Sequence, residues 1–310
     1  MRYRFVLGRE PKTCGKRKIS GAPPKMKKES QSTPAVPVAL TIAGFDPSSG
    51  AGITADLKTF SAHGIYGVAC ISAMTVQSTL GVRAVEPLPA ILVRQTLECL
   101  AEDVAFSGIK IGMLGSSAVA REVSSFLMAQ TGTIARERIV LDPVLRSTSG
   151  APLIEEEGIR VIREELLHRI GWITPNVHEL VLLAGEDAVA AETFGREQIP
   201  AAAARLKEIS SRLGNDDLNV VVTGGHLDPP DDFLLAASGE EVWLRGEQIV
   251  TNATHGTGCA FSSALLCGLI SGQLPREAVA AAKAFVTEAL RSAYPVGKGK
   301  GPMNHLFRLL

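Results

Sequence analysis

Two glycines and a threonine directly before a long apolar run have the composition of an anion-binding helix start. Gly256, Thr257 and Gly258 precede the apolar residues 264–270, an order that predicts a tight turn leading into a buried helix. A phosphate would be stabilised there by unpaired N–H groups and by the helix dipole. Cys259 falls in the first turn, where the same field favours the thiolate, so it is a candidate base. The alternative is an ordinary helix start with a small buried cysteine.

Asp142, Asn176 and Glu179 form the candidate metal group. Asp142 ends an expected strand, where its carboxylate can project into a cleft. Glu179 follows Asn176 by three residues, so both side chains share one face of a helix that starts there. Mg²⁺ prefers oxygen ligands and is usually held by one or two carboxylates together with substrate phosphates. The alternative is structural, because Asn176 and Glu179 also have the spacing of a capping box.

Three further positions have side chains or backbone suited to a nucleotide or a heteroaromatic ring. Residues 223–225, Thr-Gly-Gly, can place backbone amides along a phosphate, although a simple turn has the same composition. Lys283 lies on an amphipathic helix, where a solvated lysine is the alternative. Gln77 follows an expected strand and offers both a donor and an acceptor to a ring with adjacent nitrogen and amino groups. A structural amide is the alternative for Gln77.

The elements that must position these residues follow an alternating pattern. Short apolar runs without polar alternation indicate strands that are buried on both faces. We expect them at residues 38–44, 67–76, 108–112, 138–143, 172–176 and 218–225. Helices are expected at residues 53–60, 89–104, 117–129, 155–169, 258–271 and 275–293. Strands that alternate with helices predict an α/β fold with a mostly parallel central sheet and helices on both faces.

The expected sheet also places the candidate residues together. In a parallel sheet, ligands bind at the carboxyl ends of the strands, and the polar and glycine residues named above follow those ends. Residues 232–237 and 240–244, joined by Ser-Gly, predict a small hairpin. The sequence has no GxxxxGK[ST] motif, and no GxGxxG motif follows a strand, which argues against a P-loop nucleotidase and a dinucleotide fold.

Composition and charge divide the 310 residues at about position 35. Residues 1–30 hold ten Lys and Arg against two Glu, a net charge of +8, so the rest of the neutral chain carries −8. We expect residues 1–35 to be a disordered basic extension and residues 36–310 to form one domain. The extension has three interpretations: a transit peptide, a weak nucleic-acid-binding arm, or a segment without function. We favour the last, so nucleic acid is not an expected partner.

Cysteine usage and hydropathy indicate the compartment. Apolar residues make up 45% of the chain, but no run approaches the roughly 18 residues that a membrane span requires. The five cysteines have no CxxC spacing, which argues against zinc and favours reduced thiols in a cytoplasmic protein.

Longer motifs follow one another in order between residues 36 and 307. They occupy residues 39–44, 46–48, 50–53, 55–60, 110–115, 142–144, 147–150, 174–179, 224–226, 255–259 and 297–305. This series resembles the hydroxymethylpyrimidine/phosphomethylpyrimidine kinases of thiamine biosynthesis. The resemblance implies a ribokinase-like fold, a homodimer, and phosphorylation by ATP with Mg²⁺ of 4-amino-5-hydroxymethyl-2-methylpyrimidine and then of its monophosphate.

The resemblance also assigns roles residue by residue. The pyrimidine pocket would be lined by Gly44, Ala51, Asp56, Gln77, Met113 and Val144. ATP would be bound by Asn176, Thr223, Gly225, Thr257 and Lys283, and Mg²⁺ by Asp142 and Glu179. Cys259, with the amides of Gly256 and Gly258, would be catalytic, at the position where many sugar kinases of this fold carry an aspartate base.

Four positions depart from the family pattern, and two other functions remain open. Phe45 and Ser49 replace smaller residues, Arg146 replaces a small or apolar residue, and Thr223 stands where lysine is common. A pyridoxal kinase of the same subgroup is the nearest alternative, and Gln77 favours the aminopyrimidine over it. A pyrimidine-binding regulator without catalysis is the other alternative, against which the intact candidate metal group and helix start argue.

Overall fold

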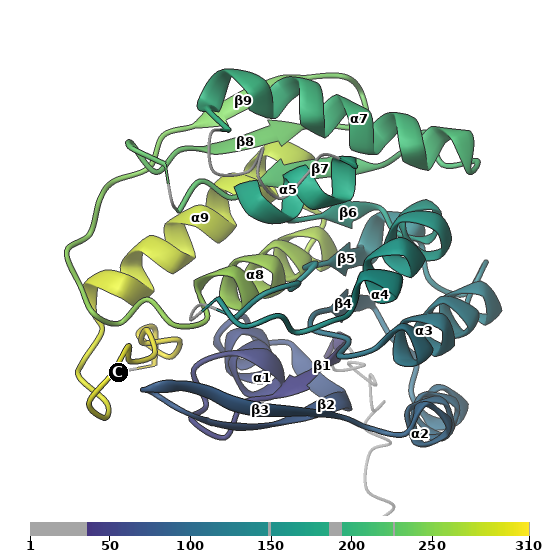
Figure 1. The fold of residues 1–310 in the computed structure, drawn as a ribbon, viewed down its shortest axis with the longest axis horizontal. Coiled ribbons are helices and arrows are strands. Elements are labelled where there is room, and N and C mark those ends of the chain that lie inside the picture. The colour runs from purple at the N-terminus through teal and green to yellow at the C-terminus, as the bar shows by residue number, and fades with distance from the viewer. Residues whose placement is uncertain (1–35, 148–149, 186–193, 226, 310) are drawn as a thin grey trace, which may run out of the picture. The chain divides into compact units, whose positions relative to one another are not determined.

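The computed structural model describes residues 36–147, 150–185, 194–225 and 227–309 (Figure 1). Within these residues, nine strands form one sheet in the order β3-β2-β1-β4-β5-β6-β7-β8-β9. Their bounds are β1 Val38–Phe45, β2 Tyr66–Ser78, β3 Gly81–Pro87, β4 Gly108–Ile111, β5 Ile139–Leu141, β6 Trp172–Ile173, β7 Asn219–Val222, β8 Asp232–Leu235 and β9 Glu241–Leu244. The expected basic extension lies outside the described residues, as do motif residues 148, 149 and 226.

The sheet is parallel in its centre and antiparallel at both edges. Strands β2, β1, β4, β5, β6 and β7 pair in parallel, which confirms the predicted architecture. Strands β8 and β9 form the predicted small hairpin, joined antiparallel to β7. The opposite edge differs from expectation, because β3 pairs antiparallel with β2.

Strand β2 is longer than the sequence pattern indicated, and its second half explains β3. Met74 and Val76 are 41% and 60% exposed, whereas Thr75 between them is buried. This alternation shows that β2 extends beyond the region covered by helices on both faces. Its free edge is then paired by β3, whose own residues are mostly half-buried or exposed. The two strands therefore form a hairpin at the edge of the sheet.

Helices cover both faces of the sheet, as predicted (Figure 1). The described helices are α1 Gly52–Ala62, α2 Ala90–Asp103, α3 Ser117–Ala129, α4 Glu156–Val161, α5 Val177–Ala184, α7 Ile199–Arg212, α8 Thr257–Ile270 and α9 Pro275–Arg291. One core contains residues of α2, α3, α5 and α7 together with Leu40, Ile42, Ile109 and Ile111 of the central strands. The other core contains residues of α1, α8 and α9 together with Ala39, Val140 and Trp172. None of the described helices is long and apolar enough to cross a membrane.

The helix expected at residues 155–169 is divided into shorter pieces. After α4 the chain forms one π-helical segment, Ile162–Leu166, and one 3₁₀ segment, Leu167–Arg169. The Glu165 carbonyl accepts hydrogen bonds from the Ser124 hydroxyl at 2.9 Å and from Arg169 Nε at 3.1 Å. Side chains thus compete for a carbonyl that a regular helix would pair with backbone, and such competition interrupts the helical ladder.

Candidate active site

Helix α8 starts against the loop that follows β1. Gly256 precedes the helix with φ of 82°, and a Cβ at this position would lie only 1.8 Å from the carbonyl oxygen of Gly50. Glycine is therefore required both for the backbone conformation and for the close approach. No side chain of the described residues caps α8, so the amides of Thr257, Gly258 and Cys259 have the arrangement expected of an anion site.

Asp46 organises the same loop. Its carboxylate accepts the backbone N–H groups of Ser48 at 2.8 Å and Ala51 at 2.9 Å, and His255 Nε2 lies 2.8 Å away. Burial alone would raise the pKa of Asp46, but hydrogen bonds from His255 and Ser48 outweigh it and lower the pKa to about 2. Gln77 Nε2 lies 3.0 Å from His255 Nε2, so the amide expected to face a ring also contacts this histidine. The loop and the start of α8 are thus tied together.

Three of the residues expected to bind the pyrimidine, Gly44, Met113 and Val144, form an apolar wall. A Cβ at Gly44 would lie 2.4 Å from Met113 Cε, so the two residues are in direct contact. Val144 packs against the small cluster that contains Met113 and Ala73. Ala51 belongs to the loop held by Asp46. The glycine at position 44 therefore leaves room for the Met113 side chain.

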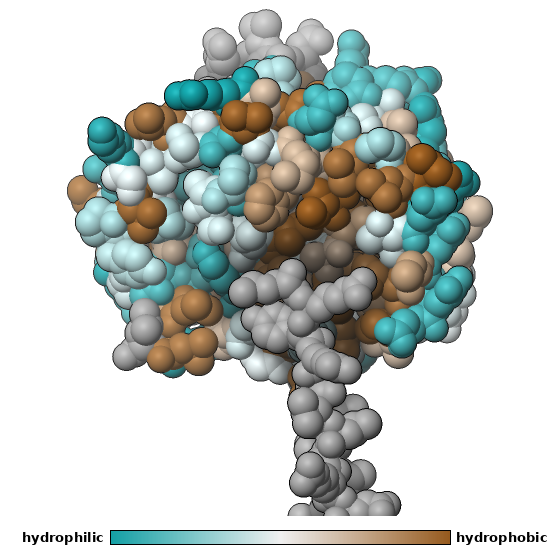
Figure 2. All heavy atoms as spheres, turned by 90° about the horizontal axis from the view of Figure 1, so that it is seen from below, coloured by the Kyte–Doolittle hydropathy of each residue, from teal (hydrophilic) through white to brown (hydrophobic). Residues whose placement is uncertain are grey.

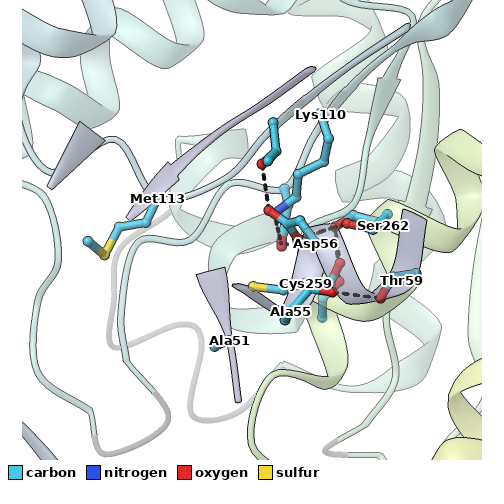
Figure 3. Close-up of polar contacts among 12 residues, drawn as sticks. Ala51, Ala55, Asp56, Thr59, Lys110, Met113, Cys259 and Ser262 are labelled. Atoms are coloured by element: carbon cyan, nitrogen blue, oxygen red, sulfur yellow. Dashed lines mark hydrogen bonds and ion pairs between the residues drawn. The ribbon is translucent and has the colours of Figure 1, made fainter. Parts of the chain in front are cut away.

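Asp56, which was also expected to bind the pyrimidine, does not belong to this apolar wall. Its side chain is fully buried and accepts hydrogen bonds from Thr41 Oγ1 at 2.6 Å, Ser263 Oγ at 2.8 Å and Lys110 Nζ at 3.0 Å. The reason is helical periodicity, because Asp56 shares the buried face of α1 with Phe60. Figure 3 shows Asp56 and Lys110 in one cluster with Cys259, while Met113 lies apart. The structure therefore places Asp56 beneath the candidate site, with its oxygens engaged by the protein.

The thiolate expectation for Cys259 is wrong for this structure. Burial raises the pKa of the thiol to about 12, with Asp142 and Asp56 acting in the same direction. The Lys110 charge and a hydrogen bond from the Gly52 backbone lower it, but by less. Cys259 is only 9% exposed, and desolvation of a thiolate there outweighs the field of the helix start.

The carboxyl groups of Asp142 and Glu179 lie close enough to interact electrostatically. Burial, followed by the Asp142 charge, raises the pKa of Glu179 to about 8. Asp142 is itself buried and accepts a hydrogen bond from Ser262 Oγ at 3.3 Å. The described residues contain no group of three or more His, Cys, Asp or Glu that could hold a metal. Two neighbouring carboxylates nonetheless suit Mg²⁺, whose other ligands are commonly water and substrate phosphates.

The capping box considered for Asn176 and Glu179 is present. The Glu179 N–H donates to Asn176 Oδ1 at 3.0 Å, and the Asn176 N–H donates to Glu179 Oε2 at 2.9 Å. This reciprocal pair starts α5. Both side chains therefore have a structural role in this structure, which was the alternative to metal and nucleotide binding.

The remaining nucleotide candidates lie along the neighbouring strand ends. Thr223 forms a parallel bridge with Asn176, which brings two of them side by side. Gly225 has open space where a Cβ would be. Lys283 lies on α9, where its Nζ contacts Asp232 Oδ2 at 2.8 Å and the Pro230 carbonyl at 3.0 Å. Because Asp232 also accepts the Gly224 N–H at 2.9 Å, Lys283 supports this turn indirectly.

Sequence reasoning missed the polar cluster beneath the site. It comprises Thr41, Asp56, Lys110, Ser262 and Ser263. One signal was present, because Lys110 is the single charged residue of an otherwise apolar four-residue strand, β4. A charged residue at the centre of a buried strand requires a buried partner, but the sequence does not show which one.

A parallel sheet whose strand ends present helix-start amides beside two carboxylates defines an α/β enzyme of the phosphotransferase class. The chain belongs to the phosphomethylpyrimidine kinase family, whose model matches residues 46–304. It is similar to the hydroxymethylpyrimidine/phosphomethylpyrimidine kinase of Haemophilus influenzae, with 37% identity over 272 residues that cover 86% of this chain and 95% of the relative.

Solved structures have the same fold. A Bacillus subtilis pyridoxal kinase in complex with ADP has a TM-score of 0.75 and 29% identity, with 89% of this chain and 100% of that chain covered. A phosphomethylpyrimidine kinase from Clostridium difficile has a TM-score of 0.68 and 32% identity, with 82% and 99% covered. The expected ribokinase-like fold is thereby confirmed.

Proposed function

We propose that this protein phosphorylates 4-amino-5-hydroxymethyl-2-methylpyrimidine with ATP and then phosphorylates the monophosphate to the diphosphate, in thiamine biosynthesis. Family membership supports the reaction class. The observation that carries the proposal is that the uncapped start of α8 lies beside the Asp142 carboxylate, whose Oδ1 would be 3.9 Å from a Cβ at Gly258. A ring against Met113 would have its hydroxymethyl group near amides suited to the transferred phosphoryl group.

Different residues of the site would then bind the ring and stabilise the transferred phosphoryl group. The apolar wall of Gly44, Met113 and Val144, with Ala51 and Gln77, would bind the ring. The amides of Gly256, Gly258 and Cys259 would stabilise the negative charge of the transferred group.

The ATP phosphates would lie along Asn176, Thr223, Gly225 and Thr257, with the turn at Gly225 supported by Lys283. Asp142 and Glu179 would hold Mg²⁺, which, when bound, neutralises phosphate charge.

Pyridoxal is the second candidate substrate. The supporting observation is the likeness in fold to a pyridoxal kinase, with a TM-score of 0.75. Pyridoxal is also a flat heteroaromatic ring with a hydroxymethyl group, so the wall at Met113 would accept it. Gln77 favours the aminopyrimidine, because its amide can pair with a ring nitrogen and an adjacent amino group.

ATP consumption with Mg²⁺ tests these assignments, with hydroxymethylpyrimidine, its monophosphate and pyridoxal compared at equal concentrations. We expect turnover of the first two substrates and weak turnover of pyridoxal. Asp142→Asn, purified identically, reports contaminating kinases, and Asp103→Asn, an exposed carboxylate at the end of α2, is the matched control. Strong pyridoxal turnover with none on the monophosphate would reassign the enzyme, and ring binding without any turnover would favour a regulator.

We also propose that two copies associate through the β2–β3 hairpin. Figure 2 shows the molecule from the side of this hairpin, with apolar side chains among polar ones. Tyr66, Met74, Val76 and Leu80, on the strands or at the turn of this hairpin, are 64%, 41%, 60% and 68% exposed. Such exposed apolar residues gathered on one element are typical of association surfaces.

A further inference from the structure

Lys110 is a fully buried cation that the proposed reaction does not yet use. It lies on β4, between β1 and β5. Ile109 and Ile111 point into the core beneath α2 and α3, so Lys110 faces the opposite side, where α1 and α8 pack. Its nearest polar partners are therefore residues of those two helices and of the neighbouring strand ends.

Two carboxylates flank the ammonium at different distances. Both oxygens of Asp56 lie 3.0 Å from Lys110 Nζ, and Asp142 Oδ2 lies 3.8 Å away. Burial would lower the pKa of Lys110, but the charges of Asp56 and Asp142 act against it, and the pKa is raised above its usual value. The Lys110 cation thus lies between two carboxylates. The oxygens of Asp56 are occupied by hydrogen bonds within the protein, whereas Asp142 lies at the candidate site.

The cluster also forms hydrogen bonds with two consecutive residues of α8. Ser263 Oγ donates to Asp56 at 2.8 Å, and Ser262 Oγ lies 3.3 Å from Asp142. Figure 3 shows Asp56 and Ser262 of this cluster near Cys259. Through its two carboxylates, Lys110 is therefore connected to the second turn of α8, which directly follows the turn whose amides face the candidate phosphoryl site.

The space around the ammonium is closed. A Cβ at Gly112 would lie 2.7 Å from Lys110 Nζ and 3.0 Å from the Cβ of Ala43. Glycine at position 112 therefore leaves room for the ammonium in its present position. An ion cluster this deeply buried stabilises a fold no better than apolar side chains of the same volume, so stability alone does not account for it.

We propose that Lys110 is a positioning residue for phosphoryl transfer, which fixes the Asp142 carboxylate and the first turns of α8 relative to each other. The inference rests on the proposed kinase reaction. It predicts that loss of the cation lowers the turnover number of both phosphorylations alike and leaves KM nearly unchanged, because Lys110 touches neither substrate. Cys259, in contrast, is expected to affect mainly the first phosphorylation.

The test compares Asp56→Asn with the double variant Asp56→Asn/Lys110→Met. Removing Lys110 alone would leave two buried anions, whereas the double variant removes one charge of each sign. Urea unfolding first establishes that both variants are folded. We then expect kcat of the double variant to be about 100-fold below that of Asp56→Asn for both substrates, the size of effect that a 1 Å misplacement produces, with KM within about threefold.

Gly112→Ala is the second variant, because it displaces the ammonium without changing any charge. We expect it to remain folded and to lose about tenfold in kcat for both steps, a smaller misplacement than the loss of the cation. The proposal is overturned if the double variant matches Asp56→Asn in kcat, if the loss appears in KM instead, or if Gly112→Ala has wild-type kcat. Absence of kinase activity in the wild-type protein would instead refute the proposed function.

Discussion

The pKa and the accessibility of single residues at this site depend on how deeply they are buried. Cys259 occupies the first turn of a helix, as its sequence context predicted, yet burial raises its pKa to about 12. Gln77, Met113 and Val144 also lie near the predicted surface, whereas Asp56 lies beneath it. Sequence spacing predicts which turn of a helix a residue occupies. It does not report the depth of protein above that turn, and desolvation depends on this depth.

Replacement of Cys259 by serine separates the two phosphorylations. In the first step a neutral alcohol must lose a proton as it attacks, whereas a phosphate monoester, with a second pKa near 6, is already anionic. Acceptance of this proton by Cys259 requires the pKa of its thiol, which burial raises to about 12 in this structure, to fall when substrate binds. On that condition Cys259→Ser lowers kcat of the first step about 100-fold and kcat of the second by less than about tenfold, as for loss of a proton acceptor. Single-turnover rates with each substrate measure this difference.

Cys267→Ser is the matched control for this experiment. It makes the same atomic change on the same helix, within the core beneath α1 and α9. Its two rates should both stay near the wild-type values. Equal losses in the two steps of Cys259→Ser would contradict a role in accepting the proton.

His305 makes stability depend on pH. It is 3% exposed, and its Nε2 has no hydrogen-bond partner among the described residues. Burial, and then the charges of Lys58 and His255, lower its pKa from 6.5 to about 4. As pH falls, the unfolded chain takes up this proton first, so the free energy of unfolding decreases between about pH 6.5 and pH 4. The full contribution is about 3 kcal/mol.

Urea unfolding of the wild type and of His305→Gln at pH 7.5 and pH 4 measures this contribution. Glutamine does not titrate, so the variant should lose about 3 kcal/mol less than the wild type over this interval. All other acidic and basic groups are common to both proteins. Identical pH slopes would show that His305 has the same pKa in the folded protein as in the unfolded chain.

At the scale of elements, strand type and helix starts could be predicted where local pattern determines them. The central strands, the β8–β9 hairpin and the first turn of α8 follow from apolar runs and glycine positions. Strand β3 could not be predicted, because Gly81–Pro87 is only partly apolar and forms a strand only because β2 extends beyond its helical cover. The helix at 155–169 was interrupted at the Glu165 carbonyl by Ser124, which lies elsewhere in the chain, and by Arg169 within the segment.

Gly256 and Gly272 provide a matched pair for testing the contact between two loops. Their φ values are 82° and 81°, but a Cβ at Gly256 would lie 1.8 Å from the Gly50 carbonyl, and nothing lies within 4 Å of one at Gly272. Gly272→Ala should cost about 1 kcal/mol from backbone strain and leave kcat unchanged. Gly256→Ala should in addition separate the loops and lower kcat at least about 100-fold.

Thermal unfolding and steady-state kinetics of both variants measure these effects. The comparison removes the conformational cost that both alanines share. Wild-type kcat in Gly256→Ala would show that the loop after β1 and the start of α8 need not touch for catalysis.

At the scale of the whole molecule, the parallel sheet determines where the candidate site lies. Strand ends that are distant in the chain meet at one edge of the sheet, so the edge could be predicted from the order of strands and helices. The buried cluster beneath it could not, because it joins residues such as Asp56 and Ser263, which are 207 positions apart. No local pattern reports a pairing over that separation.

Association of two copies is tested by placing a charge on the β2–β3 hairpin. Val76 is 60% exposed on β2, and Val250, on the chain between β9 and α8, is 98% exposed. We expect Val76→Glu to shift sedimentation from dimer toward monomer, because a carboxylate is costly to bury in an apolar contact. Val250→Glu should sediment like the wild type. A wild-type protein that sediments as a monomer would contradict the proposed association.

The segment after α9 returns to the core and has a consequence for biosynthesis. Met303 and His305 are both 3% exposed, and the Phe307 ring lies 5.3 Å from that of Phe285 on α9. A ribosome makes this segment after every strand and helix described above. The surface of α9 that contacts this segment therefore stays uncovered until the segment leaves the ribosome, and chaperones that bind nascent chains can reach it during that time. Ribosome stalling beyond residue 291 should leave a nascent chain that proteases cleave readily.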